Sequence, residues 1–183
     1  LPIFEENGLE LWPARTRAFT DLLSSVDQAA ENASVLIIDS ISHFWKELLE
    51  TYQKQKKRKF IQFQDWGVLK PQWARFTDKF VNSPVHIIIC GRAGFEYDYE
   101  EIAEGKGKEL VKTGIKMKAE TEMGYEPSLL IEMEREMDLE TRKTTRLATV
   151  LKDRSTILDG KQFRYSAETL QKGNKDFDRS EEH

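Results

Sequence analysis

The sequence of 183 residues is long enough for one domain with a hydrophobic core and too short to indicate two ordinary domains. Hydrophobic residues make up 39% and charged residues 33%, and no apolar run approaches the length of a membrane span, so a soluble globular protein is expected. The net charge of −4 argues against a uniformly basic nucleic-acid coat, although it leaves room for a local basic face.

The single cysteine and the first residues of the chain indicate the cellular compartment in which the protein is expected. Cys90 lies within an apolar run, which excludes a disulfide framework or a zinc–cysteine cluster formed by this chain alone. Nothing near Leu1 resembles a secretory signal, and the missing initiator methionine indicates a truncated chain. We therefore expect an intracellular, reducing environment.

The first third of the chain predicts a helix, a strand and a second helix. Apolar residues recur at helical spacing within residues 14–30, as on the buried face of an amphipathic helix. Val35 to Ile38 is a continuous apolar run that ends in Asp39, the pattern of a strand buried on both faces. Helical spacing returns over residues 42–59 and ends in a basic segment, which is favourable at a helix C-terminus.

A third helix and a second strand follow. Trp66 to Phe80 shows helical spacing, and Pro71 is expected in the first turn of that helix. Val85 to Cys90 repeats the apolar pattern of the first strand. The order of strand, helix and strand predicts an α/β domain with a mainly parallel central sheet and helices on both faces.

The remaining residues predict a loop and antiparallel strands. Four glycines and several acids within residues 91–108 indicate a mobile loop. Alternation over residues 115–123 and apolar runs at 129–134 and 146–152 predict strands, the last two joined by a polar turn at 138–144. We expect these antiparallel strands to be added at one edge of the parallel sheet.

The position of Asp39 is the first indication of chemistry. A carboxylate at the end of a parallel strand is delivered to the carboxyl edge of the sheet, where Mg²⁺ and nucleotide phosphates bind. An aspartate at a strand end can equally cap the next helix, and the run from Val35 to Asp39 alone leaves both interpretations open. Ser40, which follows, favours the nucleotide interpretation.

Leu36-Ile37-Ile38-Asp39-Ser40, preceded by an amphipathic helix, resembles the Walker B segment of RecA and its relatives. With Asp65-Trp66-Gly67 and the segment from Lys112 to Leu129, the chain resembles phage-encoded RecA-like or AAA P-loop ATPases of single-strand annealing and recombination, over roughly residues 17–154. The resemblance implies a RecA-like P-loop NTPase core that binds ATP and Mg²⁺. In it, Asp39 would hold Mg²⁺ through water and Ser40 would support it.

The resemblance also implies roles for three cations. RecA-like proteins place a γ-phosphate sensor at the end of the next strand; Arg92 falls there, where RecA has glutamine, and the alternative is a solvated arginine. Lys116 and Lys118 resemble the paired lysines that reach a neighbouring subunit's ATP. The alternative for them is cross-strand pairing with Glu132 and Glu134.

Two segments are candidates for DNA contact. Residues 91–107 take the place of the mobile DNA-contacting loop of RecA-like proteins, and their aromatic residues could stack on unpaired bases, but five acids there would repel phosphates. The basic run from Lys54 to Lys59 could contact DNA or an acidic partner, or be a solvated helix end.

The phosphate-binding motif GxxxxGK[ST] does not occur in the sequence, and in the family it would precede Leu1. We expect one nucleotide-binding domain at residues 1–172 and a flexible charged tail at 173–183. The whole protein would be a bacteriophage-type ATPase in the host cytoplasm, a homo-oligomer with ATP at subunit interfaces that couples ATP to single-stranded DNA. The alternative is a DNA- or protein-binding assembly module that keeps the fold without hydrolysis.

Overall fold

The computed structural model describes residue 4 and residues 6–101 and 108–166. The charged tail expected at 173–183 lies outside this part of the chain. Contacts divide the protein into two compact units, Leu1–Glu126 and Pro127–His183, and each is described by itself. The interpretation of residues 1–172 as one domain stays a prediction. No helix in the described residues is long and apolar enough to cross a membrane.

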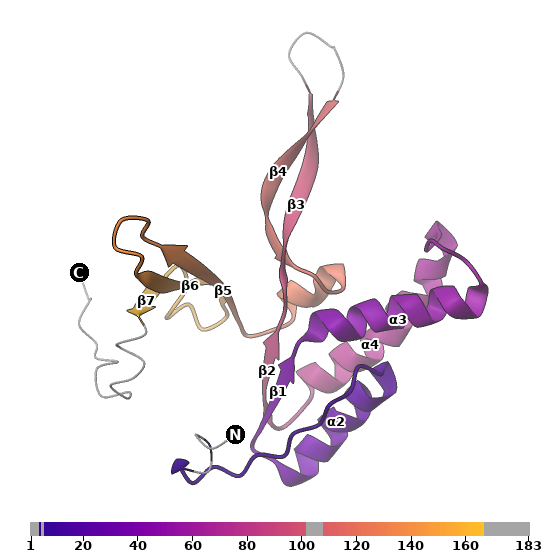
Figure 1. Ribbon diagram of the computed structural model, residues 1–183. Helices are drawn as coiled ribbons and strands as arrows, with labels where there is room; N and C mark the ends of the chain where they lie inside the picture. The colour runs from indigo at the N-terminus through magenta and orange to yellow at the C-terminus, as the bar shows by residue number, and fades with distance from the viewer. Residues whose placement is uncertain (1–3, 5, 102–107, 167–183) are drawn as a thin grey trace. The chain divides into compact units, whose positions relative to one another are not determined.

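The first unit contains the predicted helices and a parallel pair of strands (Figure 1). β1 pairs with β2 in register from Val35 opposite His86 to Asp39 opposite Cys90, so the predicted parallel arrangement of these two strands is confirmed. Pro71 lies inside α4, beyond its first turn, because the helix begins at Trp66 directly after a short 3₁₀ helix. The elements are α2 Phe19–Asn32, β1 Val35–Asp39, α3 Ile41–Lys56, η1 Phe63–Asp65, α4 Trp66–Val81 and β2 His86–Cys90.

The two parallel strands are buried on one face only. Residues alternate along each strand: Leu36, Ile38, Ile87 and Ile89 pack against the helical core, whereas Val35, Ile37 and Ile88 are about half exposed. The prediction that both faces are buried is therefore wrong for the described residues. A short apolar run cannot reveal this, because it has the same pattern whether or not a second layer covers it.

The core of the first unit is a helical layer on that buried face. Ile41, Leu69 and Phe76 are completely buried, and Leu22 nearly so. Aromatic side chains of α2, α3 and α4 pack together: Trp73 stacks on Phe19 at 5.8 Å and meets Trp45 edge to face at 5.0 Å, both measured from ring centre to ring centre. Burial of these large rings removes apolar surface from water and fixes the angle between the helices.

A long antiparallel hairpin follows β2 directly (Figure 1). β3 Ala93–Glu101 pairs with β4 Lys108–Met117, with an irregularity between Glu96 and Tyr97. The loop predicted at 91–108 is therefore wrong over residues 93–101, and residues 102–107 lie outside the described part. The strand predicted at 115–123 ends at Met117, and Thr121–Tyr125 forms the 3₁₀ helix η2.

The second unit is a three-stranded antiparallel sheet in the order β5, β6, β7. β5 Leu129–Met137 and β6 Thr144–Asp153 form the predicted hairpin, and β7 Gln162–Ser166 pairs with β6. The predicted mainly parallel sheet with antiparallel strands at its edge is not confirmed. In the described residues the parallel sheet has two strands, and the antiparallel strands form two sheets of their own.

Two aspartates organise the turns of the second unit. Asp138 accepts hydrogen bonds from the backbone N–H groups of Glu140 and Thr141, and Asp153 accepts them from Ser155 and Leu158. Because these bonds stabilise the charged form, chiefly the one from Thr141 and the one from Leu158, they lower the pKa of both carboxyl groups. Turn chemistry of this kind fixes the chain where the strands end.

Candidate functional site

The predicted site residues come together at the carboxyl ends of β1 and β2. Asp39 is the last residue of β1, is exposed, and lies opposite Cys90 in the parallel register. Arg92 follows β2 by two residues and is also exposed. Because both strands run in the same direction, their ends place the carboxylate and the guanidinium-bearing residue at one edge of the sheet.

Ser40 connects this edge to α3. It is buried, and its hydroxyl lies 3.4 Å from Nδ1 of His43, one turn into the helix. The backbone N–H of His43 donates to the Ser40 carbonyl at 3.0 Å. The peptide bond between Asp39 and Ser40 is cis. With its hydroxyl beside His43, the Ser40 side chain faces its own helix, whereas the Asp39 side chain is exposed at the surface.

A serine that the sequence analysis did not single out joins the two strand ends. Ser42 is buried in the first turn of α3, and its Oγ accepts a hydrogen bond of 2.9 Å from the backbone N–H of Arg92. The only signal in the sequence is a small polar side chain between the apolar residues Ile41 and Phe44, which needs a partner once it is buried.

The predicted lysines lie beside Arg92 in the same chain. The backbone N–H of Lys118 donates to the Arg92 carbonyl at 2.7 Å, and Lys116 lies opposite Gly94 in the hairpin. Both lysines are exposed. The backbone of β4 pairs with β3 and that of β5 with β6, each within its own unit, so the alternative of cross-strand pairing with Glu132 and Glu134 stays a prediction.

Two glycines allow this close approach. A Cβ on Gly91 would lie 2.2 Å from Cγ of Met117, and a Cβ on Gly94 would lie 2.5 Å from Cε of Lys118. The side chains of Met117 and Lys118 therefore lie over the backbone at Gly91 and at Gly94, where a Cβ would force them to shift. These glycines, which as a composition signal suggested a loop, are packing positions.

Asp39 influences the thiol of Cys90, which lies opposite it in the parallel register. Partial burial, together with the negative charge of Asp39, raises the pKa of the Cys90 thiol. The backbone of Asp39 pairs with β2, but its carboxylate makes no hydrogen bond or ion pair with any described residue. No group of three or more potential metal-ligating side chains occurs in the described residues. The edge therefore offers one unengaged carboxylate and nearby cations, rather than a closed metal cage.

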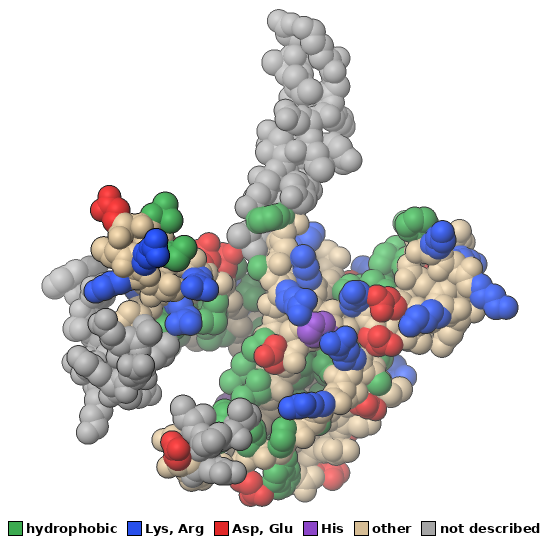
Figure 2. Space-filling view, in the orientation of Figure 1, with side chains coloured by type: hydrophobic (Ala, Val, Ile, Leu, Met, Phe, Trp, Pro, Cys, Tyr) green, Lys and Arg blue, Asp and Glu red, His purple; other side chains and the backbone are tan. Residues whose placement is uncertain are grey.

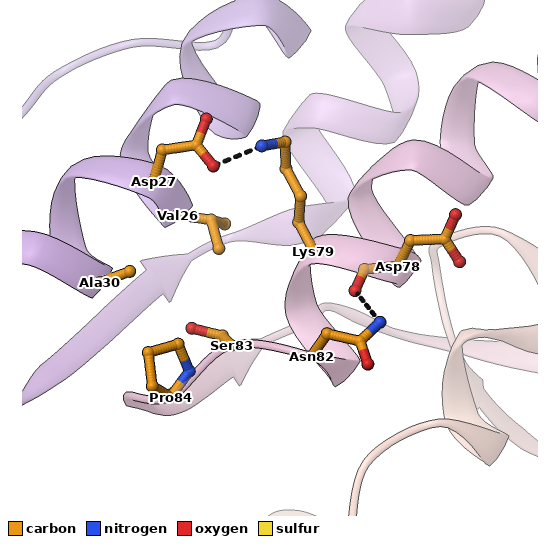
Figure 3. Close-up of a pocket in the computed structure, with 8 residues that line it drawn as sticks. All are labelled: Val26, Asp27, Ala30, Asp78, Lys79, Asn82, Ser83 and Pro84. Carbon is orange, nitrogen blue, oxygen red and sulfur yellow. Dashed lines mark hydrogen bonds and ion pairs between the residues drawn. The ribbon is translucent and has the colours of Figure 1, made fainter.

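A hollow of about 330 Å³ lies elsewhere, between the C-terminal ends of α2 and α4 (Figure 3). Its wall includes Val26, an ion pair between Asp27 and Lys79, and the Ser83-Pro84 segment that leads into β2. It therefore adjoins the amino end of β2, and contains none of the predicted site residues.

A family model described as an AAA domain matches residues 6–162. The chain belongs to the AAA domain family. Membership in this family supports a P-loop NTPase-type domain with a nucleotide-binding, ATPase-like function, and AAA domains generally bind nucleotide with Mg²⁺. Neither the comparison with curated proteins nor the comparison with solved structures gave a match.

Proposed function

We propose that this AAA domain forms part of an ATP- and Mg²⁺-binding site at the carboxyl ends of β1 and β2. One observation carries the proposal: the exposed Asp39 carboxylate ends β1 at the edge where Ser42 ties the start of α3 to the backbone of Arg92. This is the position in an α/β sheet where nucleotide phosphates and their metal bind.

The chemistry of the edge fits Mg²⁺ with ATP. Mg²⁺ in nucleotide sites keeps several waters and is held by one or two carboxylates together with substrate phosphates, so a closed cluster is not required. Asp39 would hold the ion through water, and its carboxylate is not engaged by any described residue. Ser40, whose hydroxyl lies next to His43, would support the site by fixing the strand end relative to α3.

The cations of the edge fit a polyphosphate. When bound, ATP supplies a γ-phosphate whose transfer to water releases energy. Arg92 would sense that phosphate, and Lys116 and Lys118 would neutralise phosphate charge, in this subunit's site or in that of a neighbour in a homo-oligomer. Hydrogen bonds hold the backbone of Arg92 from both sides, through Ser42 and Lys118, so that its position depends on both α3 and the hairpin.

The proposal needs a phosphate-binding loop from outside this sequence, since GxxxxGK[ST] does not occur in it. In the described residues, β1 and β2 pair only with each other, so each has a free edge with unpaired backbone groups. Such an edge is where a further parallel strand would add.

We propose that the nucleotide state is coupled to single-stranded DNA, as in phage-type RecA-like ATPases of recombination. The physical route would be short: β3 begins one residue after Arg92, so a displacement of Arg92 moves the base of the β3–β4 hairpin. The support is this connection together with family membership.

The test has two steps. The coding DNA upstream of Leu1 is read for GxxxxGK[ST] after an apolar strand, over about 30 to 80 residues, the length of one βα unit with its loop. The extended protein is then assayed for Mg²⁺-dependent ATP hydrolysis with and without Asp39→Ala. We expect the motif to be present and the substitution to abolish hydrolysis.

Either a start codon directly before Leu1 or full hydrolysis by the Asp39→Ala variant would contradict the ATPase proposal. Retained DNA or partner binding in a chain without the motif would instead favour an assembly module that keeps the fold without turnover. A third result, no dependence on nucleotide in any assay, would leave an α/β domain with a different ligand at the same edge.

A further inference from the structure

The connection between α3 and α4 carries a concentrated positive charge. We call residues 54–63 the α3–α4 tip. Five of the six residues from Lys54 to Lys59 are cationic, and residues 51–64 contain no acid, in a chain whose net charge is −4. All six of these residues are exposed. Figure 2 shows Lys and Arg side chains gathered at this end of α3, at the right of the view.

Two phenylalanines project from the same tip into solvent. Phe60 is 79% exposed and Phe63 is 92% exposed, the latter more than any other large hydrophobic residue described. The tryptophans of the neighbouring helices are packed instead: Trp73 is buried in the core, and Trp45 and Trp66, which stack on each other, lie against it. Two exposed rings beside a cluster of lysines form a patch that is unfavourable in water unless something covers it.

The backbone of the tip is held in place by a buried carboxylate. Asp65 is 4% exposed and accepts hydrogen bonds from the Gln62 backbone N–H at 2.8 Å and the Tyr52 hydroxyl at 3.1 Å. Arg58 donates to both Asp65 oxygens at 3.3 Å. The Gln62 bond above all lowers the pKa of Asp65, so the carboxylate stays charged at neutral pH.

The start of the tip is fixed as well. Lys57 adopts a left-handed conformation with φ of 53° that ends α3, and the Gln53 side chain donates to the Lys59 carbonyl at 2.8 Å. Phe60 therefore comes directly after the anchored Lys59, and Phe63 comes directly after the anchored Gln62. A surface whose order is established before binding loses less conformational entropy when a ligand arrives.

We propose that the α3–α4 tip binds single-stranded nucleic acid, with its lysines on the phosphates and with Phe60 and Phe63 stacked on bases. Positively charged surfaces that carry exposed aromatic rings bind single strands in this way, because every base offers a flat face once it is unpaired. In a duplex the faces of the bases are stacked on one another and are not accessible to the two rings. An acidic protein would pair with the lysines, but its carboxylates would not account for two exposed aromatic rings.

This inference deepens the DNA-binding half of the proposed function and places the contact away from the nucleotide edge. α3 begins directly after Ser40 and has 16 residues, so at 1.5 Å per residue the tip lies about 24 Å along the helix from the strand end. Arg58 is committed to Asp65, so the cations available to phosphates are the four lysines of the tip.

The first experiment measures binding of a fluorescein-labelled oligothymidylate of 20 nucleotides to the full chain by anisotropy, without nucleotide. The double variant Phe60→Ala with Phe63→Ala is expected to bind about tenfold or more weakly, because each stacked base is lost, while the slope of affinity against salt stays the same. The matched control truncates two other strongly exposed hydrophobic residues, Leu139→Ala and Ile157→Ala in the second unit. It should bind as the wild type does.

The second experiment replaces the charges. Glutamine at all four lysines should reduce the slope of log affinity against log salt by about 3, since each contact with a single strand contributes about 0.7. The variant carries Lys54→Gln, Lys56→Gln, Lys57→Gln and Lys59→Gln. Its control makes the same number of exposed replacements in the second unit, at Arg142, Lys143, Arg146 and Lys161.

Circular dichroism of each variant verifies folding. The proposal is overturned if the phenylalanine variant binds the oligonucleotide as tightly as the wild type. If, in that case, only the lysine variant loses affinity and poly-glutamate competes with the oligonucleotide as well as unlabelled oligonucleotide does, the partner would be an acidic protein surface. It is also overturned if the control variants lose as much affinity.

The two proposals fail separately. Binding of the oligonucleotide to the tip is measured without ATP. Asp39→Ala should leave this binding unchanged, because Asp39 lies before the first residue of α3 and the tip lies at the opposite end of that helix. Loss of hydrolysis with intact oligonucleotide binding in that variant supports both proposals. An absent phosphate loop would overturn only the ATPase proposal.

Discussion

The helical layer of the first unit and the three-stranded sheet of the second are stabilised by different means. The first unit buries twelve residues in one cluster, with large aromatic rings packed between three helices. In the described part of the second unit, the buried hydrophobic residues are Leu147 and Val150. Residues such as Met133 and Ile157 remain mostly exposed there.

The difference shows what each unit depends on. A cluster of large side chains stabilises the first unit by removing apolar surface from water, so single truncations should have large effects. The second unit depends more on its backbone hydrogen-bond ladder and on the carboxylates that fix its turns, whose individual effects are smaller. Substitutions in the two units can therefore be ranked in advance.

The largest effect is expected from Phe76→Ala. Phe76 is completely buried, stacks on Phe80 and meets Trp73 edge to face, so its truncation should lower the free energy of unfolding by about 3–5 kcal/mol. Urea denaturation followed by tryptophan fluorescence measures the change. Phe63→Ala is the control, since the same substitution at a 92% exposed site should change the free energy by less than about 0.5 kcal/mol. Equal losses at the two sites would contradict the described core.

Val150→Ala tests the small core of the second unit. Val150 is 2% exposed, and loss of its two methyl groups should cost about 1–2 kcal/mol. Hydrogen exchange should show faster opening of the amides in β6 and β7, with the helices of the first unit unaffected. Leu151→Ala, at the neighbouring position that is 49% exposed, should have a smaller effect. Protection lost equally in both units would show that they unfold together.

Ser42→Ala tests the link at the candidate site. Without the hydroxyl, the Arg92 backbone N–H loses its acceptor, at a cost of about 1 kcal/mol. The Arg92 amide should exchange faster with solvent in NMR measurements, and a nucleotide-dependent response of the hairpin should weaken. Ser25→Ala removes an exposed serine hydrogen bond within α2 and serves as the control. An unchanged Arg92 amide would show that the link does not form in solution.

The smallest effect concerns acid pH and the turn at Asp153. Its folded pKa lies below the ordinary value of 3.8, so the turn is fully stabilised above that value and loses this stabilisation as the pH falls through the folded pKa. NMR titration of the Leu158 amide should show the transition. In Asp153→Asn this dependence should disappear, and a transition that persists would assign it to another group.

Sequence patterns predicted the elements of the first unit that depend on periodicity. Phe19, Leu22, Leu23 and Val26 define the face of α2 because helical spacing repeats every three or four residues whatever lies opposite. The parallel pairing of β1 and β2 also follows from the order of strands and helices. The exposed face of these strands could not be predicted, because Val35 and Ile37 look the same beneath a second layer or beneath water.

Within the candidate site, the positions of Asp39 and Arg92 could be predicted from where the two strands end. The contacts that hold them could not. Ser42 reaches Arg92 across 50 positions of sequence, and such pairing depends on how α3 packs. Gly91 and Gly94 suggested a loop by composition, whereas the structure uses them to admit Met117 and Lys118. Glycine alone does not distinguish flexibility from close packing.

The length of α3 gives the molecule a lever. The helix starts directly after the strand that carries Asp39 and runs without interruption to the α3–α4 tip. Because its backbone is hydrogen-bonded throughout, a rotation of its first turn would move its last turn as well. Over about 24 Å of helix, a tilt of about 10° at Ser40 would displace Lys56 by about 4 Å. That distance exceeds half the spacing between successive phosphates of an extended strand. A small change in the angle of α3 at Ser40 would therefore be enough to alter the contacts between the tip and a bound strand.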